Sequence, residues 1–101
     1  MPVLSQTSAG GRCLTIRIVG RFDFRTHQEF RRAYEEQPSP PAEYVIDLRE
    51  TEYLDSSALG MLLLLRRYAG DGTSQIRLAN PSDGIKRTLS VANFQQLFDI
   101  A

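Results

Sequence analysis

The fold is decided by the stretch Tyr53-Leu54-Asp55-Ser56-Ser57-Ala58-Leu59-Gly60, which runs into Met61-Leu62-Leu63-Leu64-Leu65. Before it, Glu43–Leu48 is rich in apolar residues and predicts a buried strand. After the two serines, residues 58–68 contain no proline and no β-branched residue, which favours a helix. A strand followed closely by a helix indicates an α/β unit with a short polar segment at the junction.

Two serines stand where this helix is expected to begin. The first backbone N–H groups of a helix have no partner within it, and that end of the helix carries a partial positive charge. Asp55 or Ser56 alone would serve as an ordinary cap for these groups. A phosphate carried by one of the serines would be stabilised by the same N–H groups. From the residues alone, both interpretations stay open.

A half-buried strand is predicted near the N-terminus. The apolar residues Leu14, Ile16 and Ile18 alternate with other residues at the period of a strand. This strand is expected to end at Gly20, with Val3–Thr7 as its hairpin partner.

A capping box marks the helix that follows. Thr26 and Glu29 have the S/T-x-x-E spacing at which the two side chains satisfy unpaired N–H groups at a helix start. The helix is expected to run to about Glu36, because prolines at positions 38, 40 and 41 stop it.

The alternation of strands and helices continues to the C-terminus. The leucine-rich helix is expected to reach about Ala69 and to be broken by Gly70-Asp71-Gly72. A short strand is predicted over Gln75–Ala79, a helix over Gly84–Ser90, and an aromatic-rich segment over residues 93–100. Strands that alternate with helices predict an α/β fold: one domain, residues 1–101, with a small, mixed, mostly parallel β-sheet and helices packed against it.

The composition excludes several classes of function. Twelve basic and twelve acidic residues give a net charge of zero, which argues against a nucleic-acid partner. Cys13 is the only cysteine, so neither an internal disulfide nor a cysteine-based metal site is expected. The start of the chain lacks the pattern of a signal peptide, and the longest apolar stretch is far shorter than the ~20 residues that span a membrane. We therefore expect a cytoplasmic protein without direct membrane insertion.

The sequence also argues against an enzyme. A serine nucleophile needs a base, and the only histidine, His27, falls in the first turn of a predicted helix. No G-x-S-x-G elbow, no P-loop and no G-x-G-x-x-G motif occurs, and no cluster of metal ligands is found. We expect no cofactor and no metal.

Two further residues are candidates for the region around the serines. Asp23 follows the predicted strand that ends at Gly20, and strand ends in such a sheet meet at one edge. Asp23 is therefore expected either beside the serine pair or merely at the start of a loop. The leucine-rich helix is apolar on almost all sides, so most of its leucines are expected in the core, with Met61 as an exposed contact.

The run D-L-R-E-T-E-Y-L-D-S-S-A-L-G-M-L-L-L-L resembles the signature of the STAS family, whose best-known members are bacterial anti-sigma factor antagonists. Gly20-Arg21-Phe22-Asp23 is similar to the family's G-x-L-D element, and the tail F-Q-Q-L-F-D-I is similar to its closing motif. Ala58 stands where the family usually has glycine, and this favours the helix. The resemblance covers nearly the whole chain and implies a mixed sheet that is antiparallel at its first strand.

The resemblance implies a phosphorylation-switched binding module. Ser57 falls on the serine that accepts a phosphate in the family, and the surface around it would bind an anti-sigma factor or a histidine-kinase-like serine kinase until phosphorylation releases it. A serine phosphatase would reset the switch. The residues expected to bind the partner are Asp23, Thr26, Asp55, Ser56, Ala58 and Met61. The alternative is a constitutive accessory subunit of a lipid or anion transport complex; a nucleotide-binding module lacks a phosphate cradle.

Overall fold

A computed structural model describes residues 3–70 and 75–101 of the 101-residue chain. Five strands form one sheet in the order β1-β2-β4-β6-β7, and β3 pairs with β5 in a second sheet. Only β1 is antiparallel to its neighbour, so the sheet is mixed and mostly parallel as the sequence predicts. The strands are β1 (Val3–Thr7), β2 (Cys13–Ile18), β3 (Gly20–Phe22), β4 (Glu43–Asp47), β5 (Thr51–Leu54), β6 (Gln75–Ala79) and β7 (Asp99–Ile100). The α-helices are α1 (His27–Glu35), α2 (Ser56–Tyr68) and α3 (Asp83–Val91), with short 3-10 turns η1 (Ala9–Gly11), η2 (Phe24–Thr26) and η3 (Phe94–Gln96).

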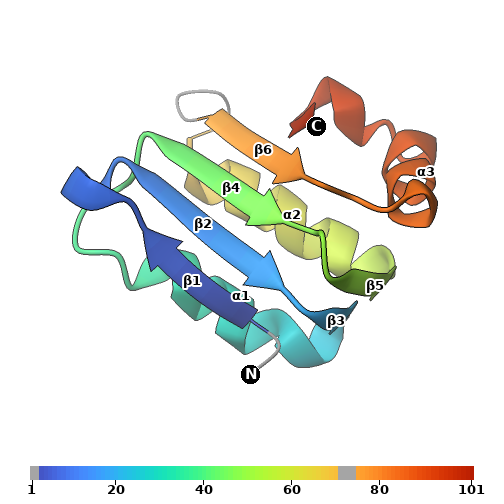
Figure 1. Cartoon of the computed structure of the whole chain (residues 1–101), viewed down its shortest axis with the longest axis horizontal. Coiled ribbons are helices and arrows are strands. Elements are labelled where there is room, and N and C mark those ends of the chain that lie inside the picture. The colour runs from blue at the N-terminus through green and yellow to red at the C-terminus, as the bar shows by residue number, and fades with distance from the viewer. Residues whose placement is uncertain (1–2, 71–74) are drawn as a thin grey trace.

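The molecule has two layers, because α1 and α2 cover the same face of the five-stranded sheet (Figure 1). Side chains alternate between the two faces of a strand, and parallel register aligns Ile16, Ile46 and Leu78 across β2, β4 and β6. All three are fully buried beneath the helices. Their neighbours Arg17 and Arg77 are exposed. The sheet is therefore apolar on one face and largely polar on the other.

Helix α2 buries one side of its surface and exposes another. Ala58, Met61, Leu62 and Leu65 are buried in the core, whereas Leu63 and Leu64 are exposed. The expectation that Met61 is exposed is wrong, because it shares the buried side with Ala58 and Leu65 at helical spacing. The expectation that most of the leucines belong to the core holds for two of the four between Leu62 and Leu65.

Two short strands escaped the sequence analysis. Gly20 does not close a strand region but opens β3, and its positive φ of 83° turns the chain out of β2. The next unpredicted strand, β5, comes directly after β4 and reaches Leu54. Both are too short for a periodic pattern to reveal them. Their pairing is the feature that builds the site described below.

The capping box predicted at Thr26 is wrong. Thr26 does occupy the N-cap of α1, but its hydroxyl donates to the carbonyl of Asp23 at 2.8 Å and makes no side-chain cap bond. The reason is that η2 precedes α1, so the chain is already turning and Asp23 supplies the cap one turn earlier. The break after α2 is confirmed at Gly70, whose φ is 98°, while Asp71 and Gly72 lie outside the described residues.

Candidate functional site

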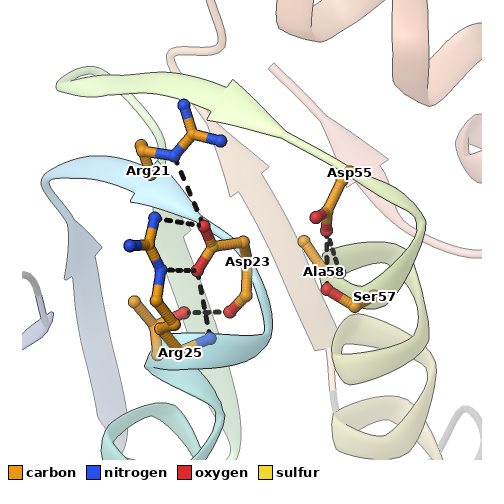
Figure 2. Close-up of polar contacts among 7 residues, drawn as sticks. Arg21, Asp23, Arg25, Asp55, Ser57 and Ala58 are labelled. Carbon is orange, nitrogen blue, oxygen red and sulfur yellow. Dashed lines mark hydrogen bonds and ion pairs between the residues drawn. The ribbon is translucent and has the colours of Figure 1, made fainter.

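The parallel pairing of β3 with β5 places two strand ends side by side. Phe22 pairs with Leu54, so the next residues, Asp23 and Asp55, emerge at neighbouring positions. Each aspartate is the N-cap of the turn or helix that follows it. Figure 2 shows the two carboxylates flanking the same edge. The sequence left two positions open for Asp23, and both are correct. Asp23 starts a loop, and it lies beside the first turn of α2, which carries the two serines.

Asp55 and Ser57 are joined at the start of α2. The Ser57 hydroxyl donates to Oδ1 of Asp55 at 2.6 Å, and the Ala58 backbone N–H donates to the same oxygen at 3.1 Å. The hydrogen bond from Ser57 holds the pKa of the Asp55 carboxyl below its usual value, and the backbone N–H groups of Ala58 and Ser57 add to this. Burial and the negative charge of Asp23 act in the opposite direction. The two carboxylates are therefore close enough to interact.

Asp23 is held by two arginines. Arg25 donates to Asp23 from its backbone N–H at 3.0 Å and from its guanidinium at 3.0 and 3.4 Å. Arg21 donates to the same carboxylate at 3.4 Å. Only 5% of the Asp23 side chain is exposed, and the hydrogen bond from Arg25 is the main reason that its pKa is lowered. The Arg21 guanidinium also lies 4.0 Å from the centroid of the Tyr53 ring, in a cation–π contact.

We call this region the Asp23–Asp55 edge and define it by the side chains of Arg21, Asp23, Tyr53, Asp55 and Ser57. Tyr53 is exposed, whereas Asp55 and Ser57 are half-buried. Ser56, next to the edge, is exposed. The Ser57 hydroxyl is thus partly accessible to another protein and hydrogen-bonded to the residue that caps its own helix.

Four of the six residues expected to bind a partner have buried side chains. Asp23, Thr26, Ala58 and Met61 are each at most 4% exposed, so they support the surface from beneath. Phe24, which is 71% exposed, and the two arginines that pair with Asp23 were not predicted from the sequence. The signal for the arginines is present in the sequence as R-F-D-F-R over residues 21–25, in which an acid stands two residues from a base on either side.

The chemistry available at the edge is that of a hydroxyl acceptor and charged hydrogen-bonding groups. Within residues 3–70 and 75–101, no group of three or more His, Cys, Asp or Glu side chains is arranged to hold a metal ion. His27 is half-buried in the first turn of α1. Across the same described ranges, no helix has the length and apolar character to cross a membrane.

Comparison with known proteins agrees with this architecture. The family model described as "Mlab, STAS domain" matches residues 5–99. A STAS-domain containing protein of Pseudomonas aeruginosa (strain UCBPP-PA14) is 54% identical over 101 residues, which is the full length of both chains. The fold is similar to that of the unphosphorylated anti-sigma factor antagonist SpoIIAA, with a TM-score of 0.76 at 17% identity over 98% of this chain and 86% of that one.

A second solved structure broadens the comparison. A sulfate transporter family protein from Wolinella succinogenes has a TM-score of 0.76 at 15% identity, covering 90% of this chain and 73% of that one. At such identities these two likenesses concern the fold alone. The family match extends over nearly the whole chain, including both strand ends of the Asp23–Asp55 edge. The chain belongs to the STAS domain family.

Proposed function

We propose that this protein is a phosphorylation-switched binding module of the anti-sigma factor antagonist type, with Ser57 as the phosphate acceptor. The observation that carries the proposal is the position of Ser57: a partly accessible hydroxyl in the first turn of α2, hydrogen-bonded to the capping Asp55. Solved structures of the fold neighbour SpoIIAA include a phosphorylated form as well as an unphosphorylated one. The protein would act in the cytoplasm by binding and not by catalysis.

The position of Ser57 explains how one group can control binding. A phosphate adds about 1.5–2 negative charges and three acceptor oxygens. At the start of α2 these oxygens face backbone N–H groups and the positive end of the helix, so the free protein tolerates them. In a complex with a partner that fits the unmodified hydroxyl, the phosphate would be buried and would lose its hydration. The phosphorylated protein would therefore bind that partner poorly.

The proposed contact surface combines accessible and supporting residues. Ser56, Ser57 and Asp55 would meet an anti-sigma factor or a histidine-kinase-like serine kinase directly, and Phe24 extends the surface with an exposed aromatic ring. The buried side chains of Asp23, Thr26, Ala58 and Met61 would fix the backbone of the two helix starts. A serine phosphatase would restore the binding state.

The proposal is tested by incubating the protein with a candidate histidine-kinase-like serine kinase and ATP. Intact mass and fragment mapping are expected to show one phosphate on Ser57, and Ser57→Ala is expected to abolish its incorporation while Ser56→Ala, the matched control, leaves it in place. Phosphate on Ser56 or on a distant residue contradicts the assignment. In binding assays Ser57→Asp is expected to lose the partner while it stays folded, because a carboxylate near a helix N-terminus is neutral or stabilising by roughly 0.3–1 kcal/mol.

The second candidate is a constitutive accessory subunit of a lipid or anion transport complex. The observation in its favour is the similarity of the fold to a sulfate transporter family protein. In that case the Asp23–Asp55 edge would be a permanent docking surface. Ser57→Ala and Ser57→Asp would then bind the partner alike. In a phosphorylation switch, Ser57→Ala keeps the partner and Ser57→Asp loses it.

A further inference from the structure

The charges along the Asp23–Asp55 edge are unevenly shared. Asp23 is paired with two guanidinium groups, those of Arg21 and Arg25. The oxygen of Asp55 that caps α2 is contacted by a neutral hydroxyl and a backbone N–H. Asp23 therefore pairs with two cations, whereas the capping oxygen of Asp55 accepts hydrogen bonds from two neutral groups. This imbalance places one cation more than the single carboxylate needs at the Asp23 end of the edge.

Arg21 is placed to reach across to the serine side of the edge. It pairs directly with Tyr53 in the parallel register of β3 and β5. Because side chains alternate along a strand, Arg21 and Tyr53 share a face with the residues two further on, Asp23 and Asp55. Asp55 is thus the diagonal cross-strand neighbour of Arg21, a relation that long side chains can bridge. Figure 2 shows the guanidinium of Arg21 above the carboxylate of Asp23, on the edge that also carries Asp55.

The present contacts of Arg21 are few and easily exchanged. Its single ion pair with Asp23 is 3.4 Å long, and 56% of its side chain is exposed. The guanidinium rests on the ring of Tyr53, two residues before Asp55. A planar cation on an aromatic face keeps its N–H donors free to turn toward a new acceptor. Tyr53 can therefore serve as the fixed support about which Arg21 turns.

Arg25 differs from Arg21 in this respect. It donates to Asp23 from its backbone and from two guanidinium nitrogens, so its position is defined by three hydrogen bonds. Its side chain is 63% exposed, similar to that of Arg21, and the two residues have the same charge and the same partner. They form a matched pair in which only one member is lightly held.

We infer that Arg21 binds the phosphate of phosphorylated Ser57, exchanging Asp23 for the phosphate while its guanidinium stays on Tyr53. This inference rests on the proposed phosphorylation of Ser57. Phosphorylation replaces the Ser57 hydroxyl, which donates a hydrogen bond to Asp55, with a dianion. The phosphate and the Asp55 carboxylate then repel each other. The fork of an arginine suits a phosphate well, and Asp23 keeps Arg25 when Arg21 leaves. The exchange thus relieves the repulsion by the movement of one side chain.

The exchange also gives phosphorylation a second effect on the surface. Moving Arg21 uncovers one side of the Asp23 carboxylate and brings the cation to the serine. A partner that recognises the unmodified edge would then meet a changed charge pattern on β3 as well as a phosphate on α2. Arg21 is therefore a second residue, besides Ser57, at which the phosphorylated protein differs from the unmodified one.

The test uses protein with phosphoserine inserted at position 57 during synthesis, so that no kinase is needed. The second pKa of the phosphate is measured by ³¹P NMR titration in the wild type, in Arg21→Gln and in Arg25→Gln. We expect the wild-type value to lie below the ordinary ~6, and Arg21→Gln to raise it by about one unit, because a nearby cation favours the dianion. Arg25→Gln, the matched control, is expected to change it by less than about a third of that amount.

A second measurement needs no variant at all. The side-chain Nε–H resonance of Arg21 is expected to shift between the unmodified and the phosphoserine proteins, while that of Arg25 stays in place. Equal effects of the two arginines on the phosphate pKa, or no effect of Arg21, overturn the inference, since either outcome leaves only the general charge of the edge. If the resonance and pKa effects appear but no kinase modifies Ser57, the arginine contact holds and the proposed function fails.

Discussion

The two strand ends of the Asp23–Asp55 edge use the same local structure with different partners. After β3 and after β5, an aspartate with extended backbone accepts a backbone N–H two or three residues further on. Asp23 is buried and paired with two arginines, whereas Asp55 is half-buried and receives a hydroxyl. A cap held by charges is therefore fixed, whereas a cap that receives a serine hydroxyl changes when that serine is modified.

The largest expected effect comes from removing the apolar residue before each cap. Phe22 is fully buried and its ring lies 5.2 Å from that of Phe30, whereas Leu54 is 7% exposed. We expect Phe22→Ala to cost about 3–5 kcal/mol and Leu54→Ala about 2–3 kcal/mol of unfolding free energy. Denaturant unfolding measures both. If Leu54→Ala lowers the free energy of unfolding as much as Phe22→Ala does, the prediction that Phe22 anchors its strand end more strongly is wrong.

A smaller effect is expected when the caps themselves are removed. Asp55→Ala should cost about 1 kcal/mol, the usual value for an N-cap. Asp23→Ala should lower the melting temperature further than Asp55→Ala does, because it also releases two arginines from their common partner. Asp23→Asn is the control, since it keeps a capping oxygen and loses only the charge. A larger loss for Asp55→Ala would reverse the comparison.

The smallest effect is expected for Ser57→Ala. Asp55 remains as the cap and its half-buried carboxylate can accept from water instead, so the lost hydrogen bond should cost only about 0.5 kcal/mol. The pKa of Asp55 should rise toward its usual value, because the hydrogen bond from Ser57 is the main cause of its depression. Carboxyl NMR titration checks this, with Asp23 as the internal reference that should not move.

The same depressed pKa values set the dependence of stability on pH. Since both carboxyls have folded pKa values below their unfolded ones, their contribution is fully present above about pH 4 and is lost as the pH falls through the folded values. In Ser57→Ala the contribution of Asp55 is smaller, because its pKa is less depressed. The free energy of unfolding should therefore fall slightly less as the pH is lowered. An unchanged acid profile would show that Ser57 does not tune Asp55.

The sequence predicted the elements whose patterns are long and missed those that are short. The helix α2 and the strand β4 follow from runs of apolar residues, and the position of a cap before α2 follows from Asp55. The strands β3 and β5 have three and four residues, too few for a period to be recognised. Their pairing brings Arg21 to Tyr53, so the arginines of the site could not be placed without it.

The errors at Met61 and Thr26 have the same origin. Met61 was expected outside because the leucine-rich helix is apolar all round, and only the packing against the sheet decides which side is buried. Thr26 was expected to form a capping box, but η2 lets Asp23 cap the chain earlier. Local spacing predicts that a helix starts, and tertiary contacts select the residue that starts it.

The separation of β3 and β5 from the five-stranded sheet has a consequence for how the protein opens. The positive φ of Gly20 turns the chain out of β2, so the β3–β5 pair forms a separate two-stranded sheet and does not continue the ladder of β2. The pairing of β3 with β5 also shifts register between Gly20 and Arg21. A short two-stranded pair has few ladder hydrogen bonds, so it opens at a lower free energy than central strands do. Amide hydrogen exchange should therefore be faster in β3 and β5 than in β2 and β4, and a group added at this edge can be accommodated by local opening while the central strands stay protected.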